Sequence, residues 1–277
     1  MNKKYPFNVR VVLLIGSLLF LLQSCNFPLA QGNSFNKQVA TQAAFAFTQT
    51  AEQSQMLTAN APTTPTPAIS AITPTSDLDD PKAQLGSAAW QDSLTSGNSF
   101  GVGNTEEQIS GTNATVWVKE GSFNMYRPTA SGGYIWYCAY PNIADFYLEA
   151  TFTVQNSNGT DEYGLFIRKP DFTDNSGYYF IVTGEGKFNL MRWTASGSTL
   201  LGEWKTDENI IKGPDATNTL GIWAEGNTIR LYINDHFAGE FNDTLGWASG
   251  YFGLFTNARQ TAGMLVKMDE ITYWNLP

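Results

Sequence analysis

The stretch Leu220–Ile233, which reads LGIWAEGNTIRLYI, decides the fold because apolar residues alternate on both sides of Gly226-Asn227. Glycine and asparagine accept the backbone angles of a tight hairpin turn. With the turn there, the facing pairs are Leu220 with Ile233, Ile222 with Leu231 and Ala224 with Ile229. A slip of one residue would move this apolar side into water. The stretch therefore predicts an antiparallel hairpin buried on one face.

The following segment extends the hairpin to a third strand. A loop of two residues would place His236 and Glu240 in the core, where unpaired polar groups cost free energy. A loop of three residues, 234–236, avoids this. It places three other residues in the core: Phe237, Gly239 and Phe241. We expect the longer loop, which leaves His236, the one histidine of the chain, exposed and without a catalytic partner.

The same register fixes what lies on the opposite side of the three strands. Trp223 faces Arg230, Arg230 faces Glu240, and Tyr232 lies in the next row. One interpretation is a solvated face, on which Arg230 stacks on Trp223 and pairs with Glu240, each contact contributing roughly 0.2–1 kcal/mol. The other is a sugar platform, on which aromatic rings contact the apolar face of a pyranose and charged groups bond its hydroxyls.

The rest of the carboxy-terminal part follows the same pattern. All eight tryptophans lie between Trp90 and Trp274. From about residue 99, short alternating segments are separated by Gly, Asn, Asp and Ser clusters, which is typical of an antiparallel sandwich. A turn at Glu120-Gly121 pairs Val116 with Met125, again on an apolar side. The sequence therefore predicts an all-β, two-sheet antiparallel sandwich over residues 87–277.

Residues 1–24 have the composition of a secretion signal. Three basic residues precede the apolar run Val11–Leu22, which is short for a membrane span. The run ends in Leu22-Gln23-Ser24-Cys25, which resembles the lipobox of bacterial lipoproteins, where the cysteine receives a diacylglycerol. The resemblance implies an extracytoplasmic protein held at a bacterial membrane through Cys25. The one other cysteine, Cys138, is expected to be a buried free thiol.

A spacer is expected between anchor and domain, over residues 25–86. Residues 26–86 contain no tryptophan or tyrosine and too little apolar surface to offset the entropy of ordering. Residues 36–57 lack Pro and Gly and could form a solvated helix, whereas 61–67 are typical of an extended proline-rich linker. Without residues 1–24, 13 of the 16 basic residues remain against 25 acidic ones. This balance argues against binding nucleic acid through its phosphates.

Six segments of the folded part occur in a familiar order. They are Asp161–Arg168, Tyr178–Ile181, Gly186–Leu190, Leu231–Asp235, Gly250–Phe255 and Met268–Ile271. Together they resemble the concanavalin A-like lectin/glucanase superfamily, in particular the laminin-G-like and 3-keto-disaccharide hydrolase groups. The resemblance covers about residues 99–273. It implies a jelly roll of two curved antiparallel sheets, with the carbohydrate site of many relatives on the concave sheet. Where the family turn usually has Asn-Gly, this chain has Asp235 in place of the glycine.

Acidic residues give few candidates for catalysis or metal binding. Retaining glucanases of this fold carry Glu-x-Asp-x-x-Glu on one strand, and the sequence contains no such triplet. The acidic pairs 161/162, 207/208 and 269/270 would point to opposite faces of a strand, so we expect them to solvate loops. Asp269 matches a last-strand position that in some relatives helps to bind calcium, so Ca²⁺ is the one cofactor considered.

Three functions remain open at this stage. The favoured one is a surface-anchored, non-catalytic domain that binds carbohydrate or another envelope component. Its candidate ligand residues are Trp223, Arg230, Tyr232, Glu240, Arg168 and Trp193. The last two are less firmly placed, because both faces of the hairpin 178–193 are apolar. The alternatives are a structural or partner-binding module, and a glycoside hydrolase of the keto-disaccharide type, which the resemblance alone implies.

Overall fold

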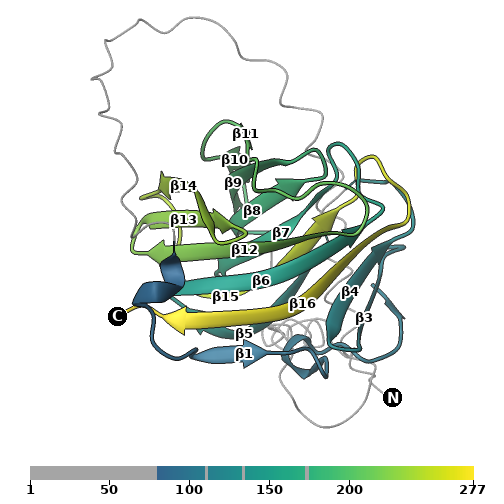
Figure 1. Cartoon of the computed structure of the whole chain (residues 1–277), viewed down its shortest axis with the longest axis horizontal. Coiled ribbons are helices and arrows are strands. Elements are labelled where there is room, and N and C mark those ends of the chain that lie inside the picture. Colours follow the sequence, from purple (N-terminus) through teal and green to yellow (C-terminus); the bar gives the residue numbers. More distant parts are fainter. Residues whose placement is uncertain (1–79, 110–111, 133–134, 172–174) are drawn as a thin grey trace, which may run out of the picture.

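The computed structural model describes residues 80–277 apart from 110–111, 133–134 and 172–174. It shows two antiparallel β-sheets stacked face to face, with β12, β6 and β16 in front in Figure 1. The predicted all-β, two-sheet jelly-roll sandwich is confirmed. None of the helices in the described part is long and apolar enough to cross a bilayer. The predicted signal peptide, Cys25 and the predicted tether up to residue 79 lie outside the described residues.

Sheet A has nine strands. In spatial order they are β14 (His236–Asn242), β13 (Thr228–Ile233), β12 (Ala216–Glu225), β6 (Phe146–Gln155), β16 (Met264–Asn275), β4 (Ser122–Arg127), β3 (Thr115–Lys119) and β2 (Glu107–Gln108), with β1 (Trp90–Asp92) also paired to β16. Two short 3₁₀ turns, η2 (Pro81–Gln84) and η3 (Asn98–Phe100), precede most of these strands.

Sheet B has seven strands. In spatial order they are β10 (Gly197–Leu200), β9 (Lys187–Thr194), β8 (Gly177–Thr183), β7 (Glu162–Lys169), β15 (Gly250–Asn257) and β5 (Ile135–Ile143), with β11 (Lys205–Thr206) also paired to β9. Cys138 belongs to β5, where the side chains of residues 135–141 lie outside the description, so its predicted burial stays a prediction.

The core is a single apolar layer between the sheets. The β12–β13 hairpin has the predicted register, with Leu220 opposite Ile233 and Ile222 opposite Leu231. These inward side chains are fully buried in one cluster that also contains Leu165 of sheet B. The predicted register of the β3–β4 hairpin, Val116 opposite Met125, is confirmed as well. The interior therefore consists of the residues that the period-two pattern selects.

The connection to the third strand differs from the prediction. Asn234 and Asp235 form a two-residue loop in which both residues have positive φ, and Ile233 pairs with His236. A bulge then places one extra residue, Ala238, in β14, so that Gly239 still faces Leu231 and remains buried. His236 is exposed, as expected. Phe237, predicted in the core, instead faces Tyr232 and packs on the outer side of sheet A.

The acidic pair 161/162 does not solvate a loop, because both residues are buried. The carboxylate of Asp161 accepts hydrogen bonds from the backbone N–H groups of Asn158, Gln260 and Thr261, at 2.7–3.2 Å. It thereby ties the loop before β7 to the loop after β15. Asp161 can be buried because several backbone donors converge on its carboxylate, which the sequence alone does not reveal.

We expect Asp161→Ala to lower the free energy of unfolding by roughly 3 kcal/mol, because three backbone N–H groups would lose their acceptor. Urea unfolding measures the change. Glu208→Ala is the matched control, since Glu208 is an exposed acidic residue and should alter stability by less than about 0.5 kcal/mol. Equal effects of the two substitutions would contradict this account of Asp161.

Candidate functional site

The outer face of sheet A carries an aromatic cluster. Tyr147 of β6 lies with its ring centroid 6.3 Å from that of Trp223 on β12 and 5.8 Å from that of Tyr232 on β13. Trp274 of β16 adds a fourth ring, 5.6 Å from Tyr147. The structure thus places Trp223 and Tyr232 on the face that the sequence predicted, and adds Tyr147 and Trp274, which the sequence analysis did not select.

This cluster is covered rather than open. The exposed fraction is 7% for Trp223, 3% for Tyr232 and 1% for Tyr147. Leu85, which follows the η2 turn, and Leu276, which follows β16, both pack against these rings. The rings are therefore neither part of a solvated face nor an open sugar platform, because segments next to the two ends of the described chain cover them.

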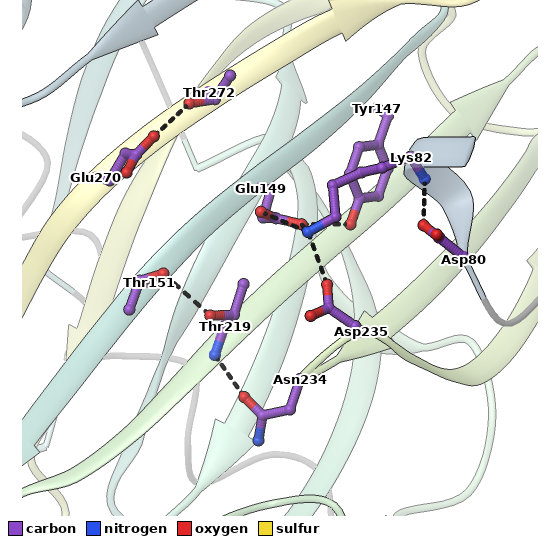
Figure 2. Close-up of polar contacts among 10 residues, drawn as sticks. All are labelled: Asp80, Lys82, Tyr147, Glu149, Thr151, Thr219, Asn234, Asp235, Glu270 and Thr272. Atoms are coloured by element: carbon purple, nitrogen blue, oxygen red, sulfur yellow. Dashed lines mark hydrogen bonds and ion pairs between the residues drawn. The ribbon is translucent and has the colours of Figure 1, made fainter. Parts of the chain in front are cut away.

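Residues 80–85, which we call the strap, are fixed to this face by Lys82. The Lys82 ammonium lies 3.0 Å from a carboxylate oxygen of Glu149 and 2.7 Å from one of Asp235 (Figure 2). Asp80 accepts a hydrogen bond from the Lys82 backbone N–H and so begins the turn. The tether predicted to reach residue 86 therefore meets the sandwich earlier, since Pro81 is already buried.

The strap also changes the electrostatics of the groups that it contacts. Partial burial lowers the pKa of Lys82, but bonds to Asp235 and Glu149 outweigh burial and raise the pKa above its ordinary value. The Tyr147 hydroxyl donates to Glu149 at 2.8 Å. Burial, and the charge of Glu149 next to it, raise the pKa of Tyr147, so this phenol stays protonated.

Arg230 and Glu240 form the predicted cross-strand pair. They lie opposite each other in the β13–β14 register, with Arg230 Nε 2.8 Å from Glu240 Oε2. Both side chains are partly exposed, at 26% and 51%. Trp223 faces Arg230 in the β12–β13 register, as predicted, while its indole N–H donates to Glu225 at 3.3 Å.

Arg168 does not join the other candidates. It has positive φ at a bulge in the β7–β15 pairing and is 1% exposed. Its guanidinium donates to the carbonyl oxygens of Ala144 and Gly226, at 3.0 and 2.6 Å, and lies 3.3 Å from Asp145. Burial lowers its pKa, which the charge of Asp145 partly offsets. Arg168 thus links β7 to the turn between β5 and β6 and to the turn between β12 and β13, and has a structural role.

Asp269 binds hydroxyl groups in this structure. Its carboxylate accepts hydrogen bonds from Ser122 at 2.6 Å and from Thr153 at 3.3 Å. In the described part of the chain, no three or more His, Cys, Asp or Glu side chains gather as a metal site would require. Calcium binding at Asp269 stays a prediction.

The outer face of sheet B is a second aromatic surface, and Trp193 lies there. The register across β15, β7, β8, β9 and β10 aligns Gly253, Phe166, Tyr179, Met191 and Leu200 in one row. Trp193 lies in the next row, 5.9 Å from Tyr179 between ring centroids. Exposure increases along the row, from zero at Phe166 and Tyr179 to 41% at Leu200.

A polar row borders the aromatic side chains of sheet B. It consists of Asn257, Glu162, Thr183 and Lys187 on adjacent strands, and Asn189 lies one row closer to the rings. The side-chain oxygens of Asn189 and Asn257 are buried and have no hydrogen-bond partner among the described residues. Their amide groups donate instead, to Gly202 and Glu162. A buried acceptor without a donor is unusual and needs an explanation.

Comparisons with known proteins were made for the whole chain. No protein-family model and no curated protein matches it. Among solved structures it is similar to a carbohydrate-binding module from Bacillus subtilis, with 18% identity, a TM-score of 0.46 and coverage of 61% of this chain and 96% of that one. It is also similar to a β-glucanase from Bacillus licheniformis, with 11% identity, a TM-score of 0.48 and coverage of 68% and 98%.

A third similar structure is a putative glycosyl hydrolase from Parabacteroides distasonis, with 11% identity, a TM-score of 0.41 and coverage of 58% and 90%. The fold itself follows from the sheet order. It is a two-sheet jelly roll.

The six candidate residues thus fall at three places. Trp223, Arg230, Tyr232 and Glu240 share the outer face of sheet A, Trp193 lies on the outer face of sheet B, and Arg168 connects the sheets at an edge. Sequence reasoning missed Asn189 and Asn257. In the sequence, each is a polar residue next to apolar ones. Its position becomes informative only when it is known which residues of β9 and β15 point outward.

We expect the ion pairs of Lys82 to stop stabilising the folded protein only at high pH. Because the pKa of Lys82 is raised on folding, its bonds stabilise fully below the unfolded-state value of about 10.4 and lose effect as pH rises through the folded value. The difference in Tm between wild type and Lys82→Met should be constant from about pH 7 to 10 and decrease above that. A difference that grows with alkalinity would contradict the assignment.

Proposed function

We propose that the domain binds carbohydrate on the outer face of sheet B, without catalysing a reaction. The observation that carries this proposal is the open end of this face, where Trp193 is partly exposed and Leu200 is 41% exposed, next to the buried ring of Tyr179. Ser198, opposite Trp193 in the β9–β10 register, is exposed and offers a hydroxyl there. Aromatic rings suit the apolar faces of sugar rings, and polar groups beside them bond sugar hydroxyls.

The exposed part of this face lies over β9 and β10. Trp193, which is partly exposed, and Leu200 extend the same face toward β10. The solved structures with similar folds include a carbohydrate-binding module.

The bonding of Glu162 supports binding rather than hydrolysis. This buried carboxylate of β7 lies 3.0 Å from the Arg259 guanidinium and accepts a hydrogen bond from Asn257 at 2.9 Å. A buried carboxylate that is already bonded to a cation and an amide is not free to contact a glycosidic oxygen. Glycoside hydrolysis needs a second carboxyl that works with the first.

Calorimetric titration with a panel of neutral and acidic oligosaccharides tests this function. We expect binding in the micromolar to millimolar range, and at least tenfold weaker binding for Trp193→Ala and for Leu200→Ala. The matched control is Thr217→Ala, on the outer face of sheet A, which should bind as wild type does. The proposal fails if no oligosaccharide binds at millimolar concentration, or if all three variants bind equally.

We further propose that the protein is attached to the outside of a bacterial membrane through Cys25. The proposal is supported by the lipobox-like Leu22–Cys25 segment directly after an apolar run. Incorporation of radiolabelled palmitate in a bacterial host should label the wild type and shift it to the membrane fraction. Cys25→Ala should lose both the label and the membrane association. Labelling of Cys25→Ala at the wild-type level would exclude this attachment.

A further inference from the structure

The covered face of sheet A combines aromatic rings with acidic groups. Tyr147 and Trp223 lie at its centre, Glu149 and Asp235 at its edge, and Glu225 accepts a hydrogen bond from the Trp223 indole. Carboxylates hold an ammonium ion through charge-assisted hydrogen bonds, and rings accept an aliphatic side chain. The face is therefore complementary to a segment that presents one lysine and one leucine.

The strap supplies that pair of side chains. Lys82 enters between Glu149 and Asp235, as Figure 2 shows, and Leu85 packs on the rings three residues later. The match depends on two side chains of a short segment and not on the rest of the domain. An identical segment from another molecule would make identical contacts.

Half of the residues of the strap are exposed to solvent. Of residues 80–86, Pro81 is buried and Lys82 and Leu85 are partly buried, while the others are exposed. The ion pairs are open to water, since the Lys82 and Asp235 side chains are 37% and 60% exposed. Exposed ion pairs contribute little to stability and are screened by salt. Residues 86–88, which join the strap to β1, are exposed as well.

We propose that the outer face of sheet A is an interaction surface for a second copy of this chain, in which two molecules exchange their straps. Each Lys82 then lies between Glu149 and Asp235 of the other molecule. Exchange of an identical element is a low-cost route to a closed two-fold dimer, because every contact is kept. The short connection at 86–88 gives the molecule's own strap a high effective concentration, so exchange needs crowding or a defect in the internal contact.

Charge-reversal variants distinguish a strap that binds its own molecule from a strap exchanged between two molecules. Lys82→Glu gives a molecule whose strap is repelled by its own carboxylates, and the double variant Glu149→Lys/Asp235→Lys gives one whose face repels its own Lys82. Mixed at equal amounts, each strap finds an attractive face only on the other molecule. We expect a 1:1 heterodimer at tens of micromolar by light scattering after gel filtration, at least tenfold reduced in 1 M NaCl.

Two matched controls accompany this mixture. Each variant alone should remain monomeric, and so should the triple variant that carries all three substitutions, because reversed charges restore attraction within one chain. Near-ultraviolet circular dichroism checks that every variant is folded. Folded variants that remain monomeric on mixing would overturn the proposal. So would a triple variant that dimerises as strongly as the mixture.

A measurement on the wild-type full chain keeps the proposal testable if a variant does not fold. Exchange requires the strap to detach, which exposes the Lys82–Ala83 bond to trypsin in the native protein. We expect cleavage there to accelerate at least threefold between 50 mM and 1 M NaCl, relative to cleavage at Lys267 within β16. A ratio that does not change with salt would overturn the proposal, since the strap would then not detach when its ion pairs are screened.

Discussion

The exclusion of water from the layer between the two sheets is the constraint on which the structure depends. Each strand of a sandwich must present an apolar side chain inward at every second position. Leu220, Ile222, Leu231 and Ile233 meet this demand from sheet A, and Leu165 meets it from sheet B. Once these positions are taken, the intervening residues are directed outward, and both candidate surfaces consist of such residues.

Much of the fold could be predicted because this parity is visible in the sequence. The β12–β13 register followed from one apolar side and one turn signal, and it correctly placed Trp223 opposite Arg230. The β8–β9 hairpin could not be assigned in this way because it is apolar on both sides. Its strands lie in a sheet whose outer face is also aromatic, so Tyr178 and Tyr179 are both buried on opposite faces.

The errors come from local backbone departures that periodicity does not contain. The bulge at Ala238 allows a two-residue loop without burying Glu240, an arrangement that strict alternation excludes. A second bulge and a positive φ direct the Arg168 side chain toward Ala144 and Gly226, in two turns, and not onto a candidate ligand face. The strap was missed because its contacts join residues more than sixty positions apart, and its composition resembles the chain before it.

The position of the strap determines how the domain would respond to tension. The described chain begins at residue 80 against sheet A, on the side away from the outer face of sheet B, and next to the carboxy terminus in Figure 1. A pull from that side reaches Lys82 and its two carboxylates before the β1–β16 hydrogen bonds. The ion pairs would break first, and the strap and residues 86–88 would then extend. The jelly roll, held by its own core, would stay folded.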